Sequence, residues 1–135
     1  MTNYLLDTHV LHWWITGVRE RVDDELDDIL SSACVQSRLF ISAITFWEIA
    51  LLQKKGRLEA DTDPLSWRAA VLNLGMQEVP VSADVAVRSI MLENMHNDPA
   101  DRMLAATAVT HHLTLVTADR MLLEWPGGLM TMDAR

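Results

Sequence analysis

Short apolar stretches alternate with longer amphipathic ones along the chain. The short stretches end in polar turns and predict buried β-strands, as at residues 4–6, where an apolar run meets Asp7 and Thr8. The longer ones repeat apolar residues at helical spacing, as residues 26–33 do. The expected strands cover residues 4–6, 39–41, 78–81, 113–117 and 129–132. The expected helices cover residues 9–15, 23–36, 64–74, 83–94 and 98–112, with a further one that Ser42 or Thr45 caps and that runs to about residue 55.

Strands that alternate with helices predict a parallel sheet covered by helices on both faces. We therefore expect an α/β fold with a central, mostly parallel sheet of four or five short strands. A length of 135 residues is typical of one domain, so residues 1–135 are expected to fold as a single unit. In sheets of this kind, ligands bind at the carboxyl ends of the strands.

Composition favours a folded, cytoplasmic protein. Half of the residues are apolar, and no stretch is dominated by Pro, Gly or Ser. The longest uncharged apolar runs, such as residues 39–47, are too short to cross a bilayer, and the first residues lack the features of a secretory signal. Cys34 is the only cysteine, which excludes an intramolecular disulfide and suits a buried filler in a reducing compartment.

Acidic residues stand where the predicted sheet would bind a ligand. Asp7 follows the first strand and Asp119 follows the strand that ends at Thr117, so both should project over the same edge of the sheet. Asp98 and Asp101 are three residues apart in the first turn of a helix and therefore share a face. Glu48 lies within an apolar stretch, where an inward-facing carboxylate needs a partner.

Each of these acids, taken singly, has an ordinary explanation as a helix cap or a turn residue. Five acids at one rim are harder to explain in that way, because neighbouring carboxylates repel unless cations lie between them. Oxygen ligands favour Mg²⁺ or Mn²⁺, and such an ion can polarise a phosphoryl oxygen and activate a water. No Gly-rich phosphate loop and no Ser–His–Asp arrangement competes with this interpretation.

The net charge of −8 is unusual for a protein that binds nucleic acid, since phosphates are normally met by Lys and Arg. Part of the negative charge would be neutralised by the expected metal. Lys54, Lys55 and Arg57 form a basic group that either follows an RNA backbone or merely complements a helix end.

Other polar and aromatic residues have simpler explanations. The histidines lack the spacing of a zinc site, and packing is favoured for His9 over contact with a substrate. The tryptophans could include a base-stacking platform, but core or interface roles are more typical at helical spacing. Arg102 either contacts a phosphate or pairs with a neighbouring acid.

Four segments resemble the PIN-domain proteins, and in particular the VapC toxins of bacterial toxin–antitoxin pairs. They follow the family's order and span nearly the whole chain. The segments are Leu-Leu-Asp-Thr-His at residues 5–9, Ile-Ser-Ala-Ile-Thr-Phe-Trp-Glu-Ile-Ala at 41–50 with Lys-Gly-Arg-Leu at 55–58, His-Asn-Asp-Pro-Ala-Asp-Arg-Met-Leu-Ala-Ala at 96–106, and Leu-Val-Thr-Ala-Asp at 115–119.

The resemblance implies a three-layer fold and an acidic quartet of Asp7, Glu48, Asp101 and Asp119 that binds the metal. Asp98 matches an additional acid. Thr117, and by analogy Thr8, would orient ligands or water. The family also implies Mg²⁺-dependent cleavage of tRNA, rRNA or mRNA, a homodimer, and inhibition by a VapB-like antitoxin. Ala100 stands where an aromatic residue is frequent.

Two rival functions remain. One is a catalytically silent PIN-like module that only binds RNA or a protein, although such a module has little reason to retain so costly a charge cluster. The other is a phosphatase or receiver domain on an α/β sheet. A phosphatase of the haloacid-dehalogenase type would need a second Asp where His9 stands, and a receiver would need an acid pair near the first strand.

Overall fold

A computed structural model describes residues 1–58 and 63–135. It contains a five-stranded sheet in the order β3-β2-β1-β4-β5, and every neighbouring pair is parallel. The strands are β1 (Tyr4–Leu6), β2 (Leu39–Ser42), β3 (Gln77–Val79), β4 (Thr114–Thr117) and β5 (Thr131–Asp133). The helices are α1 (Thr8–Thr16), α2 (Asp24–Val35), α3 (Ala43–Lys54), α4 (Pro64–Asn73), α5 (Ala83–Met91), α6 (Pro99–His111) and α7 (Arg120–Glu124).

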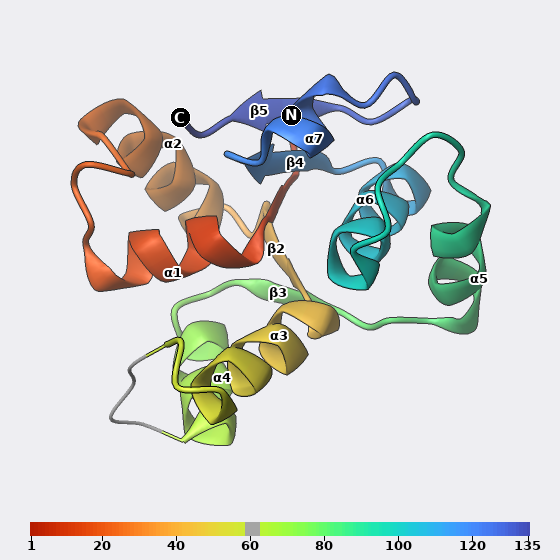
Figure 1. The fold of residues 1–135 in the computed structure, drawn as a ribbon. Coiled ribbons are helices and arrows are strands. Elements are labelled where there is room, and N and C mark those ends of the chain that lie inside the picture. Colours follow the sequence, from red (N-terminus) through yellow and green to blue (C-terminus); the bar gives the residue numbers. More distant parts are fainter. Residues whose placement is uncertain (59–62) are drawn as a thin grey trace.

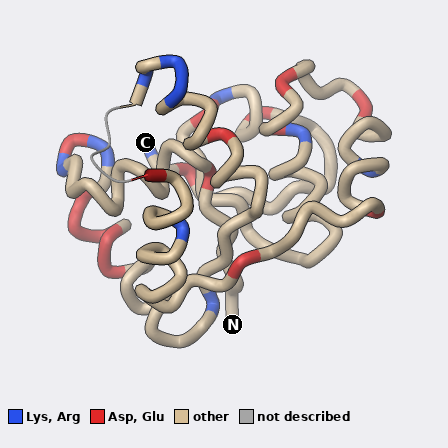
Figure 2. Tube along the Cα trace, turned by 90° about the horizontal axis from the view of Figure 1, so that it is seen from below, with Lys and Arg blue, Asp and Glu red and all other residues tan. Residues whose placement is uncertain are grey.

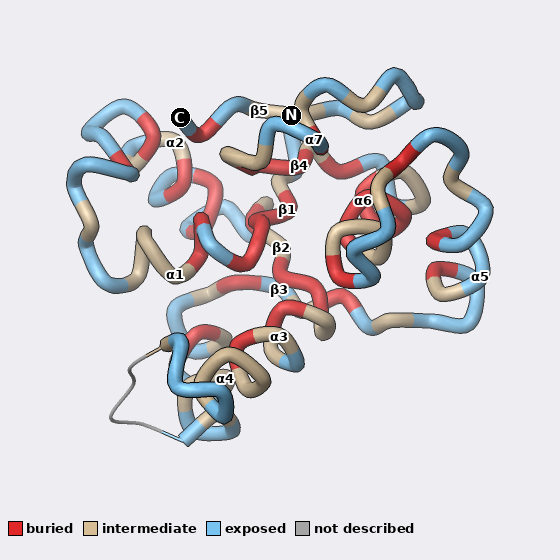
Figure 3. The backbone as a smooth tube through the Cα atoms, in the orientation of Figure 1, coloured by how far each residue is buried: buried red, intermediate tan, exposed pale blue. Residues whose placement is uncertain are grey.

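Helices cover the sheet on both sides, as expected for a three-layer α/β fold (Figure 1). Leu5 and Leu6 are adjacent in β1 and fully buried, but they belong to different apolar clusters because successive side chains of a strand point to opposite faces. Leu6 packs with α1 and α2, whereas Leu5 packs with α6. Buried positions therefore follow the strands and the inner sides of these helices (Figure 3).

Capping residues begin α3 and α6, the two helices that carry acids of the site. Ser42 begins α3 by accepting a hydrogen bond from the N–H of Ile44, and Asp98 begins α6, with Pro99 in the first turn. Both capping residues follow directly from the sequence pattern. They place the beginnings of α3 and α6 close to the carboxyl end of the sheet.

Several boundaries differ from the sequence-based expectation. β3 ends at Val79 rather than at residue 81, because Pro80 lacks an N–H to donate to the sheet. α5 ends at Met91 rather than at residue 94, and β5 covers Thr131–Asp133 rather than residues 129–132. α7 was not expected, since five residues are too few for a helical pattern to stand out. Among the described residues, no helix has both the length and the apolar character needed to cross a membrane.

Candidate metal centre

Asp7 lies at the carboxyl end of the central strand β1 and is almost fully buried, with 6% of its surface exposed. It is the residue before α1, but its carboxylate forms no helix-capping hydrogen bond with the described residues. The cap explanation therefore does not apply to it. The hydroxyl of Thr117 instead donates to its Oδ2 at 2.6 Å. Burial raises the pKa of Asp7, the Thr117 hydrogen bond opposes this, and the charge of Glu48 adds to the rise.

Thr117 also connects Asp7 to the acid that follows β4. Its hydroxyl oxygen accepts a hydrogen bond from the N–H of Asp119 at 3.0 Å while its proton is directed to Asp7. The Oδ1 of Asp119 accepts from the N–H of Met121 at 2.9 Å, which begins α7. Asp119 is thus a helix cap, but only one of its oxygens is used in this way. A single buried threonine holds two neighbouring strand ends together.

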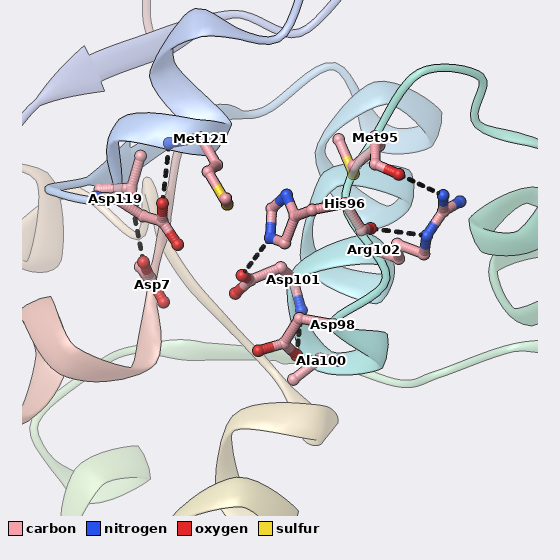
Figure 4. Close-up of polar contacts among 10 residues, drawn as sticks. Asp7, Met95, His96, Asp98, Ala100, Asp101, Arg102, Asp119 and Met121 are labelled. Atoms are coloured by element: carbon pink, nitrogen blue, oxygen red, sulfur yellow. Dashed lines mark hydrogen bonds and ion pairs between the residues drawn. The ribbon is translucent and has the colours of Figure 1, made fainter.

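Asp98 and Asp101 have different roles: the first caps a helix, and the second contributes its carboxylate to the acidic site. Asp98 caps α6, since its Oδ1 accepts from the N–H groups of Ala100 at 3.0 Å and Asp101 at 3.4 Å. Asp101, one turn further, carries a carboxylate that points from α6 toward Asp7 and Asp119 (Figure 4). Burial, followed by the charges of Asp98, Asp7 and Asp119, raises the pKa of Asp101 to about 7, although the His96 contact opposes the rise.

These acids share one pocket of about 310 Å³. Glu48 reaches it from α3 and is half-buried. The pocket is lined by Asp7, His9, Trp13, Arg21, Glu48, Asp98, Asp101, Ala118 and Asp119. All five acids singled out from the sequence are therefore brought together, from β1, α3, α6 and the end of β4.

His96 belongs to this group, although it was not among the residues expected at the site. Its Nε2 lies 2.6 Å from Oδ2 of Asp101, and both side chains are largely buried. One ligand atom each from His96, Asp101 and Asp119 lie within 4.8 Å of one another. Its only sequence signal was its position five residues before Asp101, inside the segment that resembles the family.

Arg102 does not form an ion pair with a neighbouring acid among the described residues. Its guanidinium donates to the carbonyl oxygens of His96 at 2.9 Å, Ser89 at 2.9 Å, Leu92 at 3.0 Å and Met95 at 2.5 Å. Its hydrogen bonds therefore hold the connection between α5 and α6, and with it the backbone of His96. Figure 4 shows the guanidinium turned away from the acids.

Thr8 is placed differently from Thr117. Its hydroxyl contacts that of Thr45 at 3.1 Å in a fully buried pair that joins α1 to α3. It acts on Asp7 through its backbone N–H, which lowers the pKa of that carboxyl. Its side chain does not line the pocket.

The basic group Lys54, Lys55 and Arg57 is exposed and lies outside the pocket lining. Figure 2 shows it as the blue stretch at the end of α3, well separated from the red acidic stretch of α2.

The thiol of the buried Cys34 donates a hydrogen bond to the carbonyl oxygen of Leu74, as expected for a structural residue.

The donor set fits a hard divalent cation. Four aspartates and Glu48 offer oxygen ligands. Two of these groups, Asp7 and Asp101, have a raised pKa that a nearby positive charge would lower. A cation between the carboxylates would remove the repulsion that now opposes their ionisation. His96 would add a nitrogen near one side of the same site.

Comparisons with known proteins agree with this architecture. Ribonuclease VapC22 of Mycobacterium tuberculosis (strain ATCC 25618 / H37Rv) is 32% identical over 123 residues, which cover 90% of this chain and 91% of that protein. The DNA-bound VapBC from Salmonella typhimurium has a similar fold, with a TM-score of 0.72, 20% identity and full coverage of both chains. A toxin–antitoxin complex from Klebsiella pneumoniae gives a TM-score of 0.68 at 23% identity, over 98% of each chain.

At these identities the solved structures establish the fold alone, and they confirm the expected α/β architecture with its parallel sheet. The family model described as PIN domain matches residues 4–127, almost the whole chain. Together with the VapC relative, this match confirms the resemblance drawn from the four sequence segments: the chain belongs to the PIN-domain family.

Proposed function

We propose that this chain is a metal-dependent endoribonuclease that acts as the toxin of a toxin–antitoxin pair. The observation that carries the proposal is the convergence of Asp7, Glu48, Asp101 and Asp119 on one pocket from four separate elements. Structural needs alone do not explain it, because the Asp7 side chain forms no helix-capping hydrogen bond with the described residues and burial makes its ionisation unfavourable. The identity to a protein named as a ribonuclease supports the same assignment.

Asp7, Glu48, Asp101 and Asp119 would hold Mg²⁺ or Mn²⁺ directly or through water, with Asp98 at the edge of the site. Such an ion supplies a Lewis acid that polarises a phosphoryl oxygen and lowers the pKa of water. The carboxylates accept protons and hydrogen bonds from water near the phosphodiester, and Thr117 orients Asp7. Without a cation, the same carboxylates repel the RNA backbone, so metal is expected to be needed for both binding and cleavage.

The substrate is proposed to be RNA, namely tRNA, rRNA or mRNA, in the cytoplasm. A VapB-like antitoxin is the proposed inhibitor, because one solved structure of similar fold is described as a toxin–antitoxin complex and another as a DNA-bound VapBC. We also propose a homodimer of single-domain chains.

The test is the cleavage of a mixed tRNA and rRNA pool by purified protein in Mg²⁺, in Mn²⁺ and in EDTA. Asp101→Asn is the informative variant, and Asp84→Asn is its matched control, since Asp84 is exposed, pairs with Arg88 and does not line the pocket. Cleavage that requires metal, is lost in Asp101→Asn and persists in Asp84→Asn supports the proposal. Calorimetric titration with Mn²⁺ should show weaker binding only for Asp101→Asn.

A folded, antitoxin-free protein that binds Mn²⁺ and RNA but cuts nothing in the pool would instead favour the silent binding module. Equal cleavage by the parent and Asp101→Asn would exclude this metal site as the catalytic centre.

A further inference from the structure

Three residues of the pocket wall are not accounted for by metal binding. His9 is exposed in the first turn of α1, and Trp13 lies one turn later on the same face. Their rings stack, with centroids 6.0 Å apart and planes inclined by 29°. Arg21, from the loop between α1 and α2, places its Cζ 4.9 Å from the centre of the Trp13 ring. All three line the pocket that contains the acids.

The position of Arg21 is unexpected for a cation next to so many carboxylates. Its side chain forms no ion pair or hydrogen bond with a described residue, and it rests on the indole of Trp13 instead. Its neighbour Arg19, by contrast, pairs with Asp24 at 2.5 Å. A guanidinium held on an aromatic ring keeps its N–H groups available, and these groups bind phosphate oxygens well.

Trp13 also differs from Trp14 and Trp125 in the state of its indole N–H. The indole N–H of Trp14 donates to Asp27 at 2.8 Å, and that of Trp125 donates to the carbonyl of Glu93 at 2.8 Å. The indole N–H of Trp13 has no acceptor among the described residues. Trp13 packs against the buried core and stacks with the exposed ring of His9, so it supports that ring.

We propose that His9, Trp13 and Arg21 form a nucleotide-binding subsite beside the metal centre. Arg21 would bind a backbone phosphate next to the one that is cut, and the base of that nucleotide would stack on His9, backed by Trp13. The occupant is single-stranded RNA, because a base within a duplex is already stacked between its neighbours and has no free face. This inference rests on the proposed nuclease function and adds the contacts that hold the substrate. It replaces the packing role favoured for His9 from the sequence.

The chain offers matched variants for a test. His9→Ala and Arg21→Gln change exposed side chains and should leave the fold intact. His12→Ala, on the same helix, and Arg19→Gln, two residues before Arg21, serve as controls because neither residue lines the pocket. All four are made in the Asp101→Asn background, so that RNA is not cut during the measurement. Mg²⁺ is raised until the affinity of the Asp101→Asn parent for the probe no longer changes, so that the weakened metal site is filled.

The probe is a fluorescein-labelled single-stranded RNA of about eight nucleotides, within the range of single-strand site sizes, and its affinity is measured by anisotropy. His9→Ala should weaken binding roughly tenfold, as expected for the loss of one stacked base, but should have no effect on an abasic RNA of the same length. Arg21→Gln should weaken binding of both RNAs and lower the slope of log affinity against log salt by about 0.7. The controls should bind like the Asp101→Asn parent.

Three results would overturn the inference: equal affinities for His9→Ala, Arg21→Gln and their parent; an equal loss in Arg19→Gln and Arg21→Gln, which indicates charge alone; or no binding of the probe by the parent. Cleavage by the unsubstituted chain is measured separately. A nuclease that cuts in Mg²⁺ while these variants bind normally would leave the proposed function standing and exclude only the subsite.

Discussion

The hydroxyl of Thr117 donates a 2.6 Å hydrogen bond to the carboxylate of Asp7, across 110 residues of sequence. Both residues are buried at the ends of adjacent parallel strands. The same hydroxyl accepts from the N–H of Asp119, so one side chain sets the positions of two of the proposed metal ligands. The ends of β1 and β4 are therefore joined by side-chain chemistry as well as by the sheet.

Thr117→Val should reduce cleavage roughly 10- to 100-fold, the usual effect of removing a group that orients a metal ligand. Valine keeps the shape of threonine but leaves Asp7 without its donor and the N–H of Asp119 without its acceptor. The measurement is kcat/KM on a cleaved RNA, together with the Mn²⁺ affinity. Thr110→Val is the matched control, because the Thr110 hydroxyl is buried and has no hydrogen-bond partner among the described residues. Equal activity of the two variants would contradict the role of Thr117.

His96→Ala should weaken Mn²⁺ binding and lower activity, since His96 holds one oxygen of Asp101 at 2.6 Å. The expected loss is about tenfold in metal affinity. His96→Gln should restore part of it, because an amide can still donate to the carboxylate. The comparison is made by calorimetric titration, with His111→Ala, an exposed residue at the end of α6, as the control. Unchanged metal affinity in His96→Ala would show that the His96–Asp101 contact does not contribute to metal binding.

Arg102→Met should destabilise the fold by about 3 kcal/mol, because it leaves the four carbonyl oxygens that Arg102 now satisfies without a charged donor. Urea denaturation measures the free energy of unfolding. The control is Arg88→Met, which breaks only an exposed ion pair with Asp84 and should cost less than about 1 kcal/mol. A similar small effect for both variants would show that water replaces the guanidinium in the α5–α6 connection.

The metal-free protein should lose stability as pH rises from about 4 to about 7. The pKa of Asp101 is raised from 3.8 to about 7 by burial and by the charges of Asp98, Asp7 and Asp119. Between these values the folded state binds a proton that the unfolded state does not, so this stabilisation is complete below about pH 4 and is lost as pH approaches 7. The raised pKa of Asp7 acts in the same direction.

The measurement is Tm against pH in EDTA and in Mg²⁺. In EDTA, Tm should fall less steeply with pH for Asp101→Asn than for the parent. Mg²⁺ should raise the Tm of the parent more at about pH 8 than at about pH 5, because at low pH the cation must displace a proton. Parallel pH profiles for the parent and Asp101→Asn in EDTA would contradict the raised pKa.

Much of the architecture follows from local patterns. The alternation of apolar runs and amphipathic stretches predicted all of the strands and the longer helices, because the period of apolar residues depends only on local geometry. The convergence of Asp7 and Asp119 was equally predictable, since parallel strands end at one edge of the sheet. Asp98 and Asp101 could be placed on one face for the same kind of reason.

Contacts between elements were not predictable in this way. Spacing left two roles open for Arg102, and the loop between α5 and α6 gave it a third by presenting carbonyl oxygens to it. Thr8 follows Asp7 directly and Thr117 lies two residues before Asp119, yet the Thr8 hydroxyl contacts Thr45 and the Thr117 hydroxyl donates to Asp7. The spacing of apolar residues in an element predicts which of its faces is buried. The partner of a polar side chain, in contrast, depends on which loop or helix the fold brings within hydrogen-bonding distance. The contact of His96 with Asp101, and that of Arg21 with Trp13, arise only from that packing.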